Sequence, residues 1–377
     1  EGLENAVALY KPKMIAVFTS CMPEVIGDDL TAFIKNARAK SIVPPELPIP
    51  FANTPSFAGS HVSGWDLMLL SILTTLTEGK KVEGRCTGKV NFIGGFDPNT
   101  GNAREYKRIL EAFGAPYTFL SDISDVFDSP NDGTYRLYPA GTPLAEAADS
   151  VNGKATLSVA PYASSKTMAW VKENYAGTHA AIPMPVGIQK TDAFLLKLAE
   201  LTGKPVPESL KAERGRAVDA MTDAQQYLHG KKFAVYGDPD QVAGWVSFLL
   251  EMGATPWHVL VSKGSKKLEK EPVALLESSP YGKGGKVYVN RDLWHLRSLL
   301  VTDPVDAVIG DTHGKFAARD AKVPLFRWGF PIFDRVHRHR VPFVGYQGAT
   351  NMVTELANKF LDLVDDTSDD RHFEMMR

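Results

Sequence analysis

The chain alternates short apolar runs with stretches in which apolar residues recur every three or four positions. Short apolar runs bounded by polar residues predict buried strands of parallel sheets, and the three-to-four spacing predicts amphipathic helices. The strand candidates are Met14–Phe18, Val90–Ile93, Ala155–Val159, Phe233–Val235, Trp257–Val261, Lys286–Val289, Ala307–Ile309 and Phe343–Gly345. The helix candidates include Arg104–Phe113, Asp192–Leu201, Gln241–Met252, Leu293–Leu300 and Asn351–Leu363. This alternation predicts an α/β protein with right-handed crossovers between parallel strands.

Two polar stretches interrupt the pattern and suggest domain boundaries. Lys80–Gly88 and His229–Lys232 each precede a new strand candidate. We therefore expect three Rossmann-like domains over residues 1–87, 88–229 and 230–377, with parallel four- or five-stranded sheets flanked by helices. A third segment, Ser41–Pro50, carries four prolines and must be an extended surface or packing loop, because proline breaks helices.

One cysteine stands where an α/β sheet usually holds its ligand. Cys21 follows the strand candidate Met14–Phe18 and precedes a helical pattern formed by Val25, Ile26, Leu30, Phe33 and Ile34. Open α/β sheets bind ligands at the carboxyl ends of their strands, and nearby helix N–H groups favour the thiolate. A thiolate there would bind metal or attack electrophiles. The alternative, a small buried apolar side chain, stays open on position alone.

Composition narrows the class of protein. The 377 residues are 44% hydrophobic and 23% charged, with a net charge of −2, as in ordinary globular proteins. The balanced charge gives no reason to expect nucleic-acid binding, and the absence of an apolar run of about 20 residues argues against a membrane span. Two cysteines cannot build a disulfide scaffold, so we expect a reducing, cytoplasmic location.

Two turns between a strand and a helix resemble phosphate-binding loops but lack their motifs. Gly94–Asn102 has neither a lysine followed by serine or threonine nor a clear G-x-G-x-x-G pattern, so a tight turn with an asparagine cap is favoured. Gly237–Asp240 is a turn of the same kind, with Asp240 expected to cap the following helix. A divalent-cation site at this aspartate pair is a weaker alternative.

Two further pairs of residues invite a functional reading. His337 and His339 alternate on a segment with no acidic or thiol partner near them in sequence, which favours a basic surface or subunit contact over a metal site. Trp294 and His295 are expected to pack inside an α/β core.

The surroundings of Cys21 resemble a known family. Thr19–Leu30 reads Thr-Ser-Cys-Met-Pro-Glu-Val-Ile-Gly-Asp-Asp-Leu and is similar to the segment of nitrogenase molybdenum–iron protein β chains that carries a cysteine ligand of the 8Fe-7S P-cluster. Asn53–Trp65 resembles the same family's Thr-Pro-Ser-Phe-x-Gly-Ser-His-Val-x-Gly loop. Similar segments continue in the same order along the chain at Gly141–Asp149, Glu213–Asp219, His229–Asp240, Asp292–Leu299 and Gly329–Arg335.

The resemblance implies a function and two site residues. It implies the β subunit of nitrogenase component I, in an α₂β₂ heterotetramer to which a homodimeric, ATP-hydrolysing iron protein docks transiently. Cys21 would ligate the P-cluster shared with the α chain, and the Ser56 hydroxyl would ligate iron when the cluster is oxidised. The dinitrogen-reducing iron–molybdenum cofactor would lie in the α chain. Cys86 matches no ligand position and is interpreted as a structural or incidental thiol.

Three alternatives stay open beside this reading. They are a cofactor-assembly scaffold of the same fold, the β chain of a vanadium or iron-only nitrogenase, and a relic that has lost its cluster. The family's β chains also carry an N-terminal portion with two further P-cluster cysteines. Since Leu3–Tyr10 looks like the tail of a helix leading directly into the first strand, we expect sequence upstream of Glu1.

Overall fold

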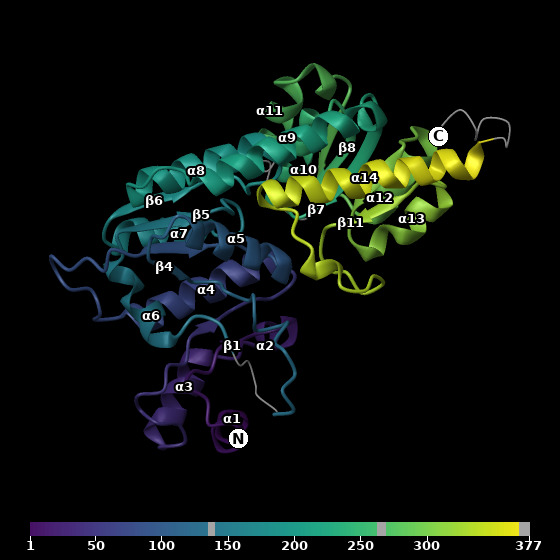
Figure 1. The fold of residues 1–377 in the computed structure, drawn as a ribbon. Coiled ribbons are helices and arrows are strands. Elements are labelled where there is room, and N and C mark those ends of the chain that lie inside the picture. The colour runs from purple at the N-terminus through teal and green to yellow at the C-terminus, as the bar shows by residue number, and fades with distance from the viewer. Residues whose placement is uncertain (135–139, 262–268, 369–377) are drawn as a thin grey trace. The chain divides into compact units, whose positions relative to one another are not determined.

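A computed structural model describes residues 1–134, 140–261 and 269–368 of the chain (Figure 1). Its contacts separate two compact units, which we describe one at a time. Unit 1 comprises Glu1–Phe96, Pro116–Ser121 and Thr142–Ala181, and unit 2 comprises Asp97–Ala115, Asp122–Gly141 and Ile182–Arg377. The three-domain division at 87/88 and 229/230 stays a prediction.

Unit 1 contains a two-stranded and a four-stranded sheet, both parallel. Its helices are α1 (Gly2–Tyr10), α2 (Cys21–Ile26), α3 (Leu30–Ala39), α4 (His61–Thr77), α6 (Leu144–Asp149) and α7 (Ser165–Asn174), with a short 3₁₀ turn at Ser150–Asn152. Its strands are β1 (Val17–Phe18), β2 (Phe51–Ala52), β3 (Val90–Ile93), β4 (Tyr117–Phe119), β5 (Ala155–Ser158) and β6 (Thr178–Ala181). The four-stranded sheet has the order β4-β3-β5-β6.

Unit 2 is built on a five-stranded parallel sheet in the order β11-β10-β7-β8-β9. Its strands are β7 (Lys232–Gly237), β8 (Thr255–Val261), β9 (Lys286–Val289), β10 (Ala307–Gly310) and β11 (Leu325–Arg327). Its helices are α5 (Thr100–Ala112), α8 (Gly187–Thr202), α9 (Glu208–Leu228), α10 (Pro239–Glu251), α11 (Lys270–Glu277), α12 (Leu293–Thr302), α13 (Lys315–Asp320) and α14 (Gly345–Thr367). Short 3₁₀ turns lie at Pro280–Gly282, Thr312–Gly314 and Arg338–Arg340. Helices α9 and α14 run side by side (Figure 1).

The predicted fold class is confirmed, and the central strands explain why. The strands β3, β5 and β10 are buried at every position, as expected for parallel strands covered on both faces. Helix α10 is buried along almost its whole length, with Trp245 and Phe248 fully enclosed. The apolar runs that predict these elements are therefore the cores of the two larger sheets.

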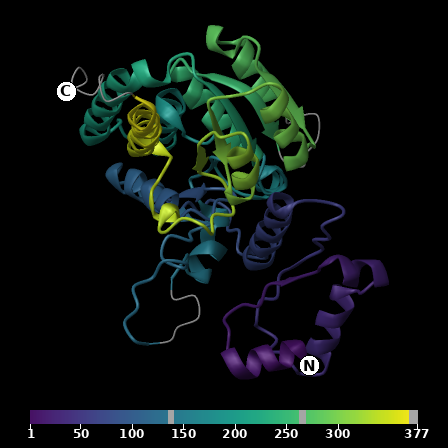
Figure 2. The same cartoon turned by 90° about the vertical axis from the view of Figure 1, so that its right-hand side faces the viewer.

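The N-terminal part of unit 1 is held together by the proline-rich segment (Figure 2, purple). Val43, Leu47 and Ile49 of this segment are buried and form a cluster against apolar residues of α1, α3 and the first strand. The segment is thus a packing loop, as predicted. Only Val17 and Phe18 of the expected strand Met14–Phe18 form the strand β1, which pairs with β2.

Two expected elements are wrong in detail. Phe343–Gly345 is not a strand: the apolar pair before α14 is buried, and the Phe343 N–H donates to Asn102 Oδ1 at 2.8 Å instead of joining a ladder. The helical pattern after Cys21 divides into α2 and α3, because Gly27 adopts a left-handed conformation (φ 78°) that ends α2. Asp29 then caps α3 through its side chain, which accepts from Ala32 N–H.

Candidate functional site

The pairing of β1 with β2 places the two sequence motifs side by side. Val17 pairs with Phe51 and Phe18 pairs with Ala52 in a parallel register. Because the strands run in the same direction, the loops that follow them leave at the same edge. Cys21 begins α2 just after β1, and Ser56 lies in the loop after β2.

The cysteine and the serine are in direct contact. Cys21 Sγ and Ser56 Oγ are 2.8 Å apart and share a hydrogen bond, and the Ser56 backbone N–H donates to the same sulfur at 3.3 Å. The Ser56 hydroxyl and then its backbone N–H lower the pKa of the Cys21 thiol from its ordinary value, against a smaller opposing effect of burial. Cys21 is half-buried and polar in its contacts, unlike an inert core cysteine.

A cavity of about 690 Å³ opens beside this pair. Both loops contribute to its wall, together with His61 at the start of α4 and Lys166 near the start of α7. Large apolar side chains on the same two loops and on α2 point into solvent, with exposures of 69% for Phe18, 74% for Met22, 75% for Val25, 68% for Ile26 and 62% for Phe57. An apolar surface of this kind marks a protein contact in soluble proteins.

Of the other sequence candidates, Cys86 lies in unit 1 and the two histidines lie in unit 2. Cys86 is exposed and does not line the cavity. The rings of His337 and His339 lie 6.4 Å apart, centroid to centroid. In the described ranges no group of three or more histidine, cysteine, aspartate or glutamate side chains is arranged to hold a metal ion.

The expected helix caps and packing residues are partly corrected. Asn99 caps α5 as predicted, because its side chain accepts from the Gly101 and Asn102 N–H groups. Asp240 does not cap α10, since that helix begins one residue earlier, at Pro239. Trp294 does not pack in a core; it is 75% exposed on α12.

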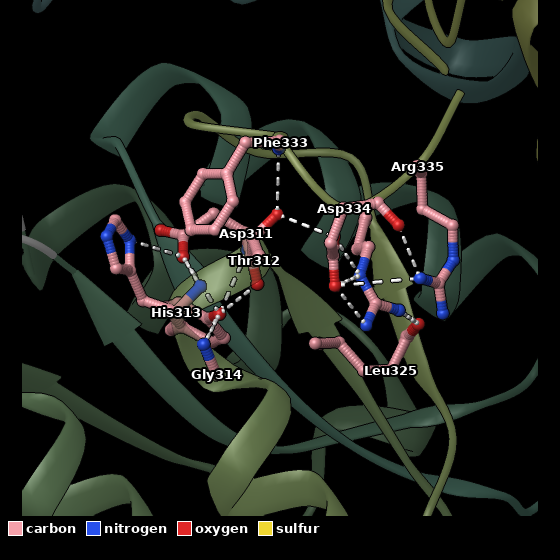
Figure 3. A network of polar contacts seen from close by, with 10 residues as sticks. Asp311, Thr312, His313, Gly314, Leu325, Phe333, Asp334 and Arg335 are labelled. Atoms are coloured by element: carbon pink, nitrogen blue, oxygen red, sulfur yellow. Dashed lines mark hydrogen bonds and ion pairs between the residues drawn. The ribbon is translucent and has the colours of Figure 1, made fainter. Parts of the chain in front are cut away.

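A second polar network follows β10 and is structural in character (Figure 3). The Thr312 hydroxyl donates to Asp334 Oδ1 at 2.8 Å and accepts from the Phe333 N–H at 3.2 Å. Arg327 holds the same aspartate through two of its nitrogens. These contacts fasten the loop before α14 to the sheet, and the sequence patterns gave no sign of them.

The donor atoms at the first site fit an iron–sulfur cluster shared with another chain. A thiolate is the usual iron ligand in such clusters, and an adjacent hydroxyl oxygen is a plausible additional one. Cys21 is the only thiol among the residues that line the cavity.

Comparisons with known proteins show which family this chain belongs to. The model of the family described as nitrogenase component 1 type oxidoreductase matches residues 1–361. Nitrogenase molybdenum–iron protein β chains from Crocosphaera subtropica and Nostoc are 50% and 51% identical, over 100% and 97% of this chain and 74% and 71% of their own length. The corresponding chain of Azotobacter vinelandii is 46% identical over 97% of this chain and 72% of its own.

A solved structure supports the same assignment. A chain described as nitrogenase Cp1 at pH 6.5 superposes with a TM-score of 0.93 and 37% identity, covering 99% of this chain and 80% of that one. A second chain, described as nitrogenase Cp1 at pH 5, has a TM-score of 0.71 at 15% identity and shares the fold. The chain therefore belongs to the family of nitrogenase molybdenum–iron protein β chains.

Family membership confirms the expected class, cofactor and partners. The chain is a β subunit of an oxidoreductase that is active as a complex, which favours the main prediction over the alternative of a cofactor-assembly scaffold. The β chains of this family share the P-cluster with the α chain, which holds the iron–molybdenum cofactor, in a complex served by the iron protein. In the described ranges no helix is long and apolar enough to cross a membrane.

Proposed function

We propose that this chain contributes two ligands to the P-cluster: the Cys21 thiolate permanently and the Ser56 hydroxyl oxygen in the oxidised state. The observation that carries the proposal is the 2.8 Å contact between Cys21 Sγ and Ser56 Oγ at the edge of the β1–β2 sheet. When bound, the cluster stores electrons and passes them toward the site of dinitrogen reduction. This chain's residues hold it and adjust how readily it gives electrons up.

The same contact explains how one residue can act conditionally. The Ser56 hydroxyl is already hydrogen-bonded to the sulfur, so it lies next to any iron that this sulfur binds. An oxygen ligand that binds only the oxidised cluster stabilises that state and therefore lowers the reduction potential. The Ser56 N–H donates to the sulfur independently of the hydroxyl, which keeps the loop in place when the hydroxyl changes partner.

The surface around the site fits an obligate partner. The exposed apolar side chains of α2 and of the two loops surround the half-buried cysteine. Obligate interfaces are large and more hydrophobic than the rest of a surface, so we assign this patch to the α chain. Both cysteines are free, which is consistent with the reducing cytoplasm that we propose as the location.

Ligand substitution in the assembled complex tests the proposal. Cys21→Ala, co-expressed anaerobically with the α chain, should lower the iron content and remove the P-cluster signal in electron paramagnetic resonance while the complex still forms. Cys86→Ser is the matched control, because it removes the other thiol and should change neither quantity. Full iron content and normal substrate reduction in Cys21→Ala would contradict the proposal.

The role of Ser56 needs a separate measurement. Ser56→Gly should leave the cluster assembled and raise the midpoint potential of an oxidation step by roughly 30–60 mV, which is about 0.7–1.4 kcal/mol for one electron. Redox titration of the complex measures this. Unchanged midpoints for every step would remove the proposed role of the hydroxyl and leave that of Cys21 intact.

A further inference from the structure

Behind the cysteine–serine pair, threonine side chains continue the pairing of the two strands. The Thr19 N–H donates to the Ala52 carbonyl at 3.2 Å, one step beyond the last paired residues. The Thr54 N–H then donates to Thr19 Oγ1 at 2.9 Å, and the Thr54 hydroxyl donates to the Thr19 carbonyl at 2.8 Å. Thr19 is only 4% exposed, so these hydrogen bonds are shielded from water.

A glutamate connects this pair to the helix that carries the cysteine. Glu24 lies three residues after Cys21 on α2, and its carboxylate accepts a hydrogen bond from the Thr19 hydroxyl. The other carboxylate oxygen is 3.5 Å from Asn53 Nδ2. Residues three apart on a helix share a face, so the bond to Glu24 fixes the rotation of α2 that also orients Cys21.

Few other contacts could hold this helix. It has six residues, no buried side chain and no side-chain hydrogen bond at its N-cap, Ser20. Its apolar residues Met22, Val25 and Ile26 are exposed in this chain. Beside the two hydrogen bonds between Cys21 and Ser56, the contacts of Glu24 with Thr19 and Asn53 link α2 to the strand ends of unit 1.

The spacing of the two loops is matched. Thr19 stands two residues before Cys21, and Thr54 stands two residues before Ser56. A slip of one residue would displace the two side chains by about 3.3 Å, which is more than the distance that now joins them. We infer that Thr19, Glu24 and Thr54 form a latch, that is, a set of positioning residues that keeps Cys21 Sγ and Ser56 Oγ in contact, so that both side chains would face the same cluster. The inference rests on the proposed ligand roles of Cys21 and Ser56.

A disulfide-trapping experiment measures the alignment without the cluster. In the full chain carrying Cys86→Ser, the Ser56→Cys variant should close a disulfide with Cys21 when treated with oxidised glutathione, which accepts the two electrons and two protons. Adding Thr19→Val should make closure about tenfold slower, because a disulfide forms only within narrow Cα and Cβ distances. Thr19→Ser, which keeps the hydroxyl, should restore the rate.

Two further variants separate the latch from general loss of structure. Thr74→Val removes an exposed hydroxyl on α4 that bonds only to the Leu70 carbonyl, so it should leave the closure rate unchanged. Glu24→Ala should slow closure even if Thr19→Val fails to fold, whereas Glu24→Gln should slow it less, since its amide oxygen still accepts a hydrogen bond. Unchanged closure in both Thr19→Val and Glu24→Ala would overturn the latch.

Redox titration of the assembled complex tests the consequence for the cluster. Thr19→Val should retain iron, because Cys21 remains, and should shift the midpoint potential in the direction produced by Ser56→Gly. Thr19→Ser should restore the original midpoint. A Thr19→Val midpoint equal to that of the unmodified complex, beside a shifted Ser56→Gly midpoint, overturns the latch. An unshifted Ser56→Gly midpoint instead removes the role of Ser56, and the trapping rates still decide whether the latch sets the alignment.

Discussion

A buried carboxylate that joins two helices of unit 2 should make this chain less stable as the pH rises. Glu251, at the end of α10, accepts hydrogen bonds from the backbone N–H groups of Ile188 and Gln189 at 2.8 and 3.0 Å, and so caps the start of α8. Gly187 leaves room for it, because a Cβ at this left-handed position would lie 2.6 Å from the carboxylate. Burial raises the pKa of Glu251 from 4.5 to about 7, the two N–H donors oppose this rise, and the charge of Asp192 adds to it.

The direction and the size of this change in stability with pH follow from proton linkage. Between pH 4.5 and 7 the folded chain holds a proton on Glu251 that the unfolded chain has released. Its stabilising effect is complete below the unfolded pKa and is lost as the pH rises through the folded pKa. Each tenfold change in proton affinity is worth about 1.4 kcal/mol, so the group removes at most roughly 3 kcal/mol between pH 5 and pH 8.

Glu251→Gln should abolish this dependence, because it has nearly the same shape and no charge to release. The assay is hydrogen exchange of the peptide spanning the start of α8, comparing variant and unmodified chain at pH 5 and again at pH 8. The ratio of the protection factor in the variant to that in the unmodified chain should be larger at pH 8 than at pH 5. Glu200→Gln, an exposed position on α8 paired with Lys197, is the control and should show no such difference. If this ratio of protection factors is the same at both pH values for Glu251→Gln, the proposed titration of Glu251 does not govern the stability of α8.

Three further substitutions test other parts of the fold. Asp334→Asn should cost about 3–5 kcal/mol in urea unfolding, because it leaves the charge of Arg327, which is only 10% exposed, without its partner; a loss below 1 kcal/mol would contradict this. Asp66→Asn should cost about 1–3 kcal/mol and loosen α7 in hydrogen exchange, since the buried carboxylate caps that helix through Thr167 N–H at 3.0 Å. Trp294→Ser should change the free energy of unfolding by no more than about 0.5 kcal/mol, because the ring is exposed in this chain; a loss well above this in thermal unfolding would contradict the prediction.

The fold class could be predicted because the central strands are buried on both faces. Val90–Ile93, a central strand buried at every position, has the bounds expected from its apolar run. Lys286–Val289 also has the expected bounds, although it is an edge strand and only partly buried. Short or half-exposed strands such as Thr178–Ala181 carry no such run and were missed. The hydrophobic pattern wrongly predicts a strand at Phe343–Gly345. An apolar pair that leads into a buried helix has the same hydrophobicity as a short buried strand.

Helix starts were harder to locate than helix interiors. The pattern predicts α10 from Gln241, but the structure begins it at Pro239, where a proline is tolerated because its missing N–H would have no partner. Trp294 shows a different limit. Its helix has the expected bounds within two residues, yet the face that α12 turns to solvent depends on packing that the local sequence does not specify.

At the functional site, the sequence predicts the ligands but not what holds them in register. Cys21 stands out because it is a thiol at the end of a strand candidate and lies in a motif that resembles the family, and Ser56 stands out only through the motif around it. Thr19 and Thr54 belong to the two motifs that resemble the family, but nothing in those motifs assigns them a role; their role follows only from the pairing of β1 with β2. The matched two-residue spacing is visible in the sequence once that pairing is known.

A contact as short as 2.8 Å between residues 35 apart needs a rigid element on each side, and the two-residue strands are too short to supply it alone. The hydrogen bonds of Thr19 and Thr54 extend the pairing toward Cys21 and Ser56, which is why the proposed positioning residues, more than the strands, should govern the alignment of the two proposed ligands.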